Sequence, residues 1–241
     1  MGHTVGVSEP NPTRLRHLTT PRSAALAGVL FAVLFALVIY LLRSSLPEGA
    51  QPGSQWLDTG NDKIRLASEI MPFAGISFLW FIAVVRANLG RYEDRFFATV
   101  TLGSGLLFLA MMFASAAVGA GLAESRHYSG GGLAGGAVGV FGQMLLLKLS
   151  KVYALKMAAV FMMSLATIWL RTGLMPKWLT IVTYLSALAL IIGGEKSLWL
   201  TMAFPAWVLI VSVLFLVRSG WFEHRGEEHQ HHHREHGDQH L

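Results

Sequence analysis

Long stretches without a charged residue constrain the fold of this chain more than any other feature. Twenty uncharged residues separate Arg22 from Arg43, and twenty-eight separate Arg95 from Glu124. Three further charge-free runs cover 70–85, 178–194 and 197–217. About 20 apolar helical residues, at 1.5 Å each, cross the roughly 30 Å hydrocarbon core of a bilayer. These runs predict an all-α, polytopic transmembrane helical bundle.

Composition agrees with this prediction, and a sixth span completes it. Of 241 residues, 53% are hydrophobic and 14% are charged, whereas soluble domains carry about 25% charged residues. The stretch from Val152 to Leu170 contains Lys156, whose long stem can extend to the interface. The expected spans are 24–42, 68–87, 97–122, 152–170, 178–194 and 197–217, forming a domain at 23–218 between an N-terminal tail (1–22) and a His-rich tail (219–241).

The distribution of Lys and Arg predicts the orientation of these six spans. Eleven basic residues fall on the side of the two termini and eight on the other side, and basic residues favour the cytoplasm. Both termini are therefore expected in the cytoplasm of a bacterial inner membrane. Trp169 and Trp178 flank a predicted cytoplasmic loop, so we expect both at the membrane interface.

The run from Tyr128 to Leu147 allows two interpretations. It has twenty uncharged residues, enough to span, but seven are glycines, each less favourable in a helix than alanine by about 1 kcal/mol. One interpretation is a Gly-rich extracytoplasmic loop followed by an interfacial or re-entrant helix from about Val138 to Lys151. The other is a seventh span, which would place the C-terminus outside.

Small residues recur every four positions in two segments, a spacing that lets helices approach closely in membranes. Gly131, Gly135 and Gly139 form one series, and Ser115 and Gly119 belong to another. Two readings stay open. The residues either form a subunit interface or gate, or they serve packing within the chain or a loose loop.

The C-terminal tail holds seven of the ten histidines. If the tail were helical, His229, His233, His236 and His240 would form one stripe able to bind a divalent transition metal. The alternative is a solvated polar tail with incidental metal affinity. No histidine lies in a predicted span, so haem is not expected, and the absence of cysteine excludes thiolate metal sites.

Three lysines, Lys148, Lys151 and Lys156, follow the Gly-rich run. They can form a basic patch that binds the phosphate of lipid headgroups. The simpler interpretation is that they anchor helices at the interface.

The predicted spans contain almost no ionisable or catalytic residues. No Asp or Glu lies deep within them, which disfavours a proton- or cation-coupled transporter, and we find no recognisable catalytic site or cofactor motif. We therefore expect an accessory, scaffold or assembly subunit of a membrane complex, in contact with lipids and with a protein partner or a second copy. The alternative is a transporter or sensor of a small solute, lipid or metal ion that uses the His-rich tail. The positive net charge of +5 gives little support to nucleic-acid binding.

Three motifs in the second half of the chain resemble a pattern found in uncharacterised six-helix membrane proteins of actinobacteria. They are Met157–Met162, Leu170–Gly173 and Pro176–Leu179. The resemblance implies a six-helix inner-membrane protein and implies no activity. The residues also have a physical account, because Gly173 can cap the fourth span and Pro176 can start the fifth.

Overall fold

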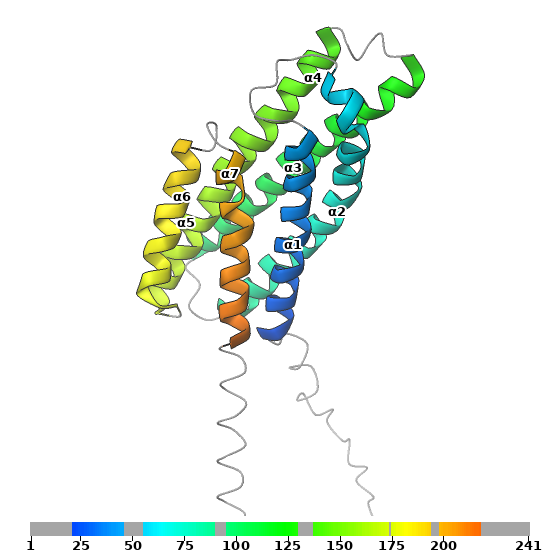
Figure 1. Ribbon diagram of the computed structural model, residues 1–241. Helices are drawn as coiled ribbons and strands as arrows, with labels where there is room; N and C mark the ends of the chain where they lie inside the picture. The colour runs from blue at the N-terminus through cyan, green and yellow to red at the C-terminus, as the bar shows by residue number, and fades with distance from the viewer. Residues whose placement is uncertain are drawn as a thin grey trace, which may run out of the picture.

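The computed structural model describes residues 21–45, 55–89, 95–129, 137–173, 175–193 and 198–217, and these residues are almost entirely helical (Figure 1). No strand occurs among them. The elements are α1 (Pro21–Ser45), α2 (Gln55–Leu89), α3 (Arg95–Ser129), α4 (Ala137–Lys148), the π-helical segment η3 (Leu149–Ala154), α5 (Leu155–Thr172), α6 (Lys177–Gly193) and α7 (Leu198–Thr201), which is followed by a helix at Ala203–Val217.

The predicted fold class is confirmed: the described helices form an all-α bundle with the length and composition of a membrane protein. Four of them are long and apolar enough to cross a bilayer, namely Ala25–Leu42, Gly60–Arg86, Phe96–Ser125 and Ala137–Thr172. Two shorter apolar helices, Lys177–Gly193 and Ala203–Val217, complete the bundle. In Figure 1, α1 begins and Ala203–Val217 ends at the same end of the bundle, opposite α4. We call the end at which α4 lies the α4 end.

Helices α2 and α3 extend well beyond the predicted spans, both toward the α4 end. Helix α2 has 35 residues, about 52 Å at 1.5 Å per residue, and it begins thirteen residues before the predicted span at 68–87. Helix α3 continues seven residues past the expected end of its span at position 122. Hydropathy locates the part of a helix that fits hydrocarbon, and it does not report where the helix itself ends.

The segment expected as a separate interfacial helix is instead continuous with the next span. The structure runs without a break from Ala137 to Thr172, through α4, η3 and α5. The predicted start of a span at Val152 lies inside η3 and is not a helix end. A π-helical turn continues the backbone hydrogen bonding of a helix while accommodating an extra residue, so one rod replaces the two predicted helices.

A cluster of aromatic side chains closes the centre of the bundle. Phe31 of α1 lies 4.6 Å from Phe78 of α2, and Phe108 of α3 lies 4.9 Å from Phe204 of the last helix, measured between ring centroids. All four rings are fully buried. Such edge and offset contacts between rings add to the attraction from burial. The centre of the bundle is therefore solid and apolar.

Trp169 was expected at the membrane interface, and the structure buries it within the bundle. Its side chain is 1% exposed and its ring centroid lies 6.0 Å from that of Trp207. The indole N–H of Trp207 donates a hydrogen bond to Thr183 Oγ1 at 2.8 Å, which ties the last helix to α6. Trp178, in contrast, is 55% exposed. Tryptophan serves the core as readily as the interface, because burial of its large ring is favourable wherever its N–H finds an acceptor.

The expected cap at Gly173 is confirmed. Its φ is +66°, the left-handed conformation that favours glycine, and its N–H donates to the carbonyl of Trp169 at 2.9 Å. Pro176 directly precedes α6, and its carbonyl accepts the N–H of Leu179 at 3.0 Å. This turn reverses the chain between α5 and α6 at the end opposite α4.

Candidate functional site

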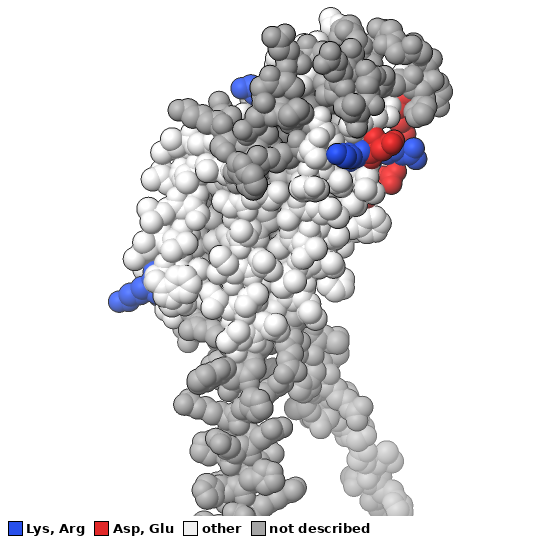
Figure 2. Space-filling model, in the orientation of Figure 1, with Lys and Arg blue, Asp and Glu red and all other residues white. Residues whose placement is uncertain are grey.

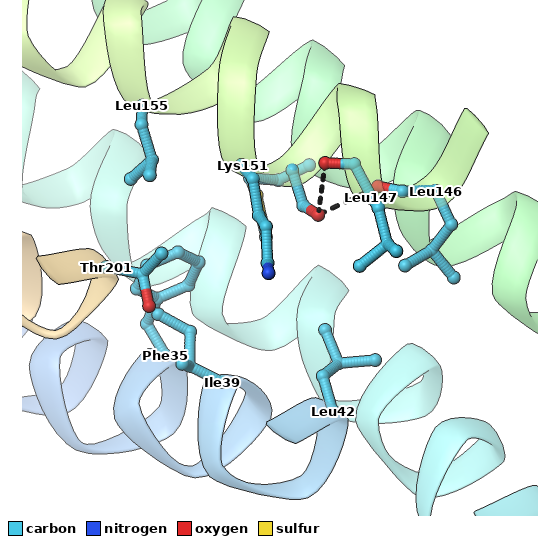
Figure 3. Close-up of a pocket in the computed structure, with 10 residues that line it drawn as sticks. Phe35, Ile39, Leu42, Leu146, Leu147, Lys151, Leu155 and Thr201 are labelled. Atoms are coloured by element: carbon cyan, nitrogen blue, oxygen red, sulfur yellow. Dashed lines mark hydrogen bonds between the residues drawn. The ribbon is translucent and has the colours of Figure 1, made fainter. Parts of the chain in front are cut away.

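One pocket of the described residues lies between α1, α3, the α4–η3–α5 rod and the end of α7 (Figure 3). Its cavity volume is about 40 Å³, well below the range of about 300 to 1,000 Å³ that holds small ligands. It is lined by Phe35, Ile39, Leu42, Met112, Leu146, Leu147, Ser150, Lys151, Leu155 and Thr201. Seven of these side chains are apolar, so an apolar surface with a few polar groups faces the pocket.

Lys151 supplies the only charge among the described lining residues. Figure 3 shows its side chain leaving the helix and reaching into the space in front of Ile39 and Leu42. The neighbouring Ser150 donates a hydrogen bond to the carbonyl of Leu146 at 2.8 Å. The pocket therefore combines an apolar wall with one cationic ammonium group.

Lys151 lies within the long apolar segment Ala137–Thr172. Arg171 lies twenty positions further along the same rod, a rise of about 30 Å. The guanidinium of Arg171 lies 4.8 Å from the ring centroid of Phe97 at the opposite end of the bundle. In Figure 2 the charged side chains lie toward the two ends, and the flank between them carries none in this view.

The π-helical segment determines which residues of this rod face inward. The buried positions of α4 include Gly139, Gln143 and Leu146, and those from the end of η3 onward include Ala154 and Ala158. A regular α-helix with the register of α4 would bring position 157 to the core, since its buried positions recur every 3.6 residues. One extra residue in η3 shifts the register, so Ala158 is buried and Lys156 is exposed.

The three predicted lipid-binding lysines occupy different environments. Lys148 and Lys156 are exposed and do not line the pocket, whereas Lys151 is half-buried and lines it. The sequence grouped them by proximity. It did not distinguish Lys151, because the distinction depends on η3 and on α1, which is more than a hundred residues away in the chain.

The predicted packing residues lie partly within and partly outside the described residues. Ser115 donates a hydrogen bond to the carbonyl of Leu146 at 3.1 Å, and a Cβ added at Gly119 would lie 3.1 Å from a methyl group of Leu146. These residues of α3 therefore contact α4 within the chain. Gly139 is buried in α4. Gly131 and Gly135 lie outside the described residues.

A second feature of this end is an exposed apolar face on α4. Val138 is 64% exposed and Phe141 is 67% exposed, and Met144 and Leu145 continue the same surface. Leu146, the next residue, packs on Ile64 of α2, which lies between the exposed Lys63 and Arg65. The apolar face thus begins at the level of the charged part of α2 and continues away from the bundle centre.

Sequence reasoning did not identify this face, although its residues are visible as an apolar segment. Its significance depends on its position along the bundle axis. Only the packing of α4 beside the charged part of α2 establishes that position.

The predicted metal ligands His229, His233, His236 and His240 lie outside the described residues. Within the described ranges, no group of three or more His, Asp or Glu side chains could hold a metal ion. The exposed charges on α2 include an ion pair between Arg65 Nε and Glu69 Oε1 at 3.1 Å. A surface pair of this kind is typical of a solvated helix face.

No protein-family model, curated protein or solved structure matches this chain.

Proposed function

We propose that this chain is an accessory or assembly subunit of a membrane complex in the bacterial cytoplasmic membrane. In this proposal the α4 end lies outside the cytoplasm and both termini lie inside. The orientation is supported by the tally of eleven basic residues against eight and by the positive-inside tendency of membrane proteins. Three exposed acidic side chains lie toward the α4 end, namely Asp62, Glu69 and Glu124.

The observation that carries the proposal is the exposed apolar face of α4. Phe141 lies ten residues beyond Lys151, about 15 Å along a helix axis. The polar layer of a bilayer adds only about 5 to 8 Å on each side of the hydrocarbon, so an upright rod would carry Phe141 past the lipid. Exposed apolar patches at such a position mark protein–protein contacts. A partner subunit that covers Val138, Phe141 and Met144 would remove this surface from water.

The aromatic core favours this function over the transporter alternative. Phe31, Phe78, Phe108 and Phe204 fill the bundle centre, and a solute crossing there would have to displace them. The described acidic groups Asp62, Glu69 and Glu124 lie outside the charge-free runs, whereas coupled transporters place such groups at mid-membrane. A subunit with a structural role needs neither a path for a solute nor an ionisable group that couples transport.

A site-specific photocrosslinker tests the proposal in the intact cell. The crosslinking amino acid replaces Phe141 in the full chain, and the matched control replaces Leu188 of α6, which is 52% exposed within an apolar helix. We expect a discrete protein adduct at Phe141, either with a partner or with a second copy, and none at Leu188.

Two results would overturn the proposal. One is the absence of a protein adduct at Phe141 together with purification of the chain from mild detergent as a lone monomer. The other is an equal yield of the same adducts at both positions, because it would indicate random collision in the membrane.

A further inference from the structure

We infer that a groove between α1 and α2 is a binding site for an acyl chain of one membrane glycerophospholipid. In this site the hydrocarbon chain lies along the groove, and the indole N–H of Trp80 donates a hydrogen bond to the ester carbonyl at the head of that chain. The inference goes beyond the proposed subunit role, since it concerns a surface away from the α4 end and a different class of ligand.

The groove has room for a ligand. Its cavity volume is about 380 Å³, within the range of about 300 to 1,000 Å³ that holds small ligands, whereas the pocket beside Lys151 has about 40 Å³. Helices α1 and α2 pack side by side along it (Figure 1). Its lining consists of Leu26, Ala27, Leu30, Ile76, Ser77 and Trp80.

Small side chains form the floor of the groove. Ala27 and Ser77 are buried, whereas the four larger lining side chains are exposed. The two helices approach closely here, since a Cβ added at Gly28 would lie 2.7 Å from a ring carbon of Phe81. The hydroxyl of Ser77 donates to the carbonyl of Phe73 at 2.9 Å, so its proton is already engaged. Because no lining residue is ionisable either, the groove favours hydrocarbon over a polar solute.

Both walls of the groove belong to segments that are long and apolar enough to cross a bilayer. Leu26 and Leu30 lie in Ala25–Leu42, and Trp80 lies in Gly60–Arg86. Walls within such segments face lipid rather than water when the helices span. The occupant of the groove is therefore drawn from the bilayer.

Trp80 forms the wall of the groove that is nearest the membrane surface. It precedes Arg86 by six residues, about 9 Å along the helix axis, at the end of α2 away from the α4 end. Its side chain is 65% exposed. Indole rings favour this level of a bilayer because the ring is apolar and the N–H seeks an acceptor. An ester carbonyl supplies that acceptor directly above an acyl chain.

The width of the groove favours a lipid chain over a partner helix. An α-helix with its side chains is about 10 to 12 Å across, which exceeds the roughly 8 to 10 Å between the axes of two packed helices. Only single side chains of a partner helix could enter between walls that stand on α1 and α2. An unbranched acyl chain can instead lie along the groove and contact both walls and the floor.

The experiment maps lipid contacts on the purified full-length protein in phosphatidylcholine nanodiscs. A small fraction of the lipid carries a diazirine near the carboxyl end of one acyl chain, and mass spectrometry of the digested protein locates the adducts after illumination. We expect adducts on 26–30 and 76–80 several times more often than on the exposed apolar positions of α6 at 181–192.

A blocking variant and a donor variant test the two parts of the site. Leu30→Trp fills the groove from an exposed position and should reduce its labelling to the level of α6. Leu188→Trp is the matched control, because Leu30 and Leu188 are both 52% exposed, and it should leave groove labelling unchanged. Trp80→Phe keeps an aromatic wall without the N–H and should lower groove labelling about fivefold, the effect of losing one hydrogen bond.

The inference fails if the adducts are spread evenly over the groove and α6, because the lipid then acts only as bulk solvent. It also fails if Leu30→Trp keeps the excess labelling of the groove, and unchanged labelling in Trp80→Phe contradicts the proposed hydrogen bond. Few adducts in the groove, together with a dimer in native mass spectrometry, would assign the groove to a second copy and overturn the lipid site.

Discussion

Leu146 and Ala154 lie on the same buried face of one continuous helix although eight residues separate them, and they are 2% and 0% exposed. A regular α-helix returns to the same face after seven residues. The additional residue is accommodated by η3, between α4 and α5. This register shift buries Ala158 and Ala159 and brings Lys151 to the pocket.

Removing one residue from η3 should leave the fold intact. Deletion of Val152 converts the segment to regular α-helix and keeps both buried faces aligned, so we expect the melting temperature in detergent to change by only a few degrees. Deletion of Val160 is the matched control within α5. It rotates every preceding core residue of the rod by about 100° relative to those that follow. We expect this control to lose the folded protein. Loss of the folded protein with the Val152 deletion, or an unchanged melting temperature with the Val160 deletion, would contradict the register assignment.

Substitution by leucine should affect stability very differently at two positions that lie two residues apart. Lys156 is exposed and Ala158 is fully buried. Lys156→Leu is expected to change the free energy of unfolding by less than about 1 kcal/mol. Ala158→Leu forces extra carbon atoms into a filled core and should cost about 1 to 3 kcal/mol. Denaturant titration in detergent measures both, and an inverted order would place Lys156 in the core.

Close helix packing should make Gly28 sensitive to a single methyl group. A Cβ there would overlap Ser212 Oγ and lie 2.7 Å from a ring carbon of Phe81, which is fully buried. Gly28→Ala should therefore destabilise the protein by about 1 to 3 kcal/mol. Gly103→Ala is the control, because nothing lies within 4 Å of the added Cβ, and it should be neutral or stabilising by up to about 1 kcal/mol. Equal effects would mean that α1, α2 and the last helix are not packed this closely.

Metal binding, if the sequence prediction holds, should depend entirely on the His-rich tail. Isothermal titration of the full chain with Zn²⁺ should show binding that disappears when the chain ends before Glu223, because truncation removes His229, His233, His236 and His240. His3, His17 and His127 remain as an internal control. Undiminished zinc affinity after truncation would show that the tail is not the metal site.

The helical class of this chain was predictable because hydrocarbon imposes one simple requirement. A charge-free run of about 20 residues must satisfy its backbone groups internally, and a helix does so locally. The same local logic correctly predicted the cap at Gly173, where a left-handed residue precedes the next helix. Neither inference required knowledge of distant residues.

Helix ends beyond the hydrocarbon and the environments of individual side chains were not predictable in this way. Charged residues such as Lys63 and Arg65 ended the predicted span, yet they continue α2 as a solvated helix. Tryptophan is a residue type common at membrane interfaces, but the side chain of Trp169 packs against Trp207 in the core. Both outcomes depend on which helices pack together.

The sequence by itself therefore determined the all-α class and the apolar spans, since hydropathy and backbone hydrogen bonding are properties of a segment alone. Only the tertiary structure decided that α4 and α5 form one rod, that Lys151 rather than Lys148 or Lys156 lines a pocket, and that α4 leaves an apolar face exposed. These features arise from contacts between helices far apart in the chain, which no local pattern encodes.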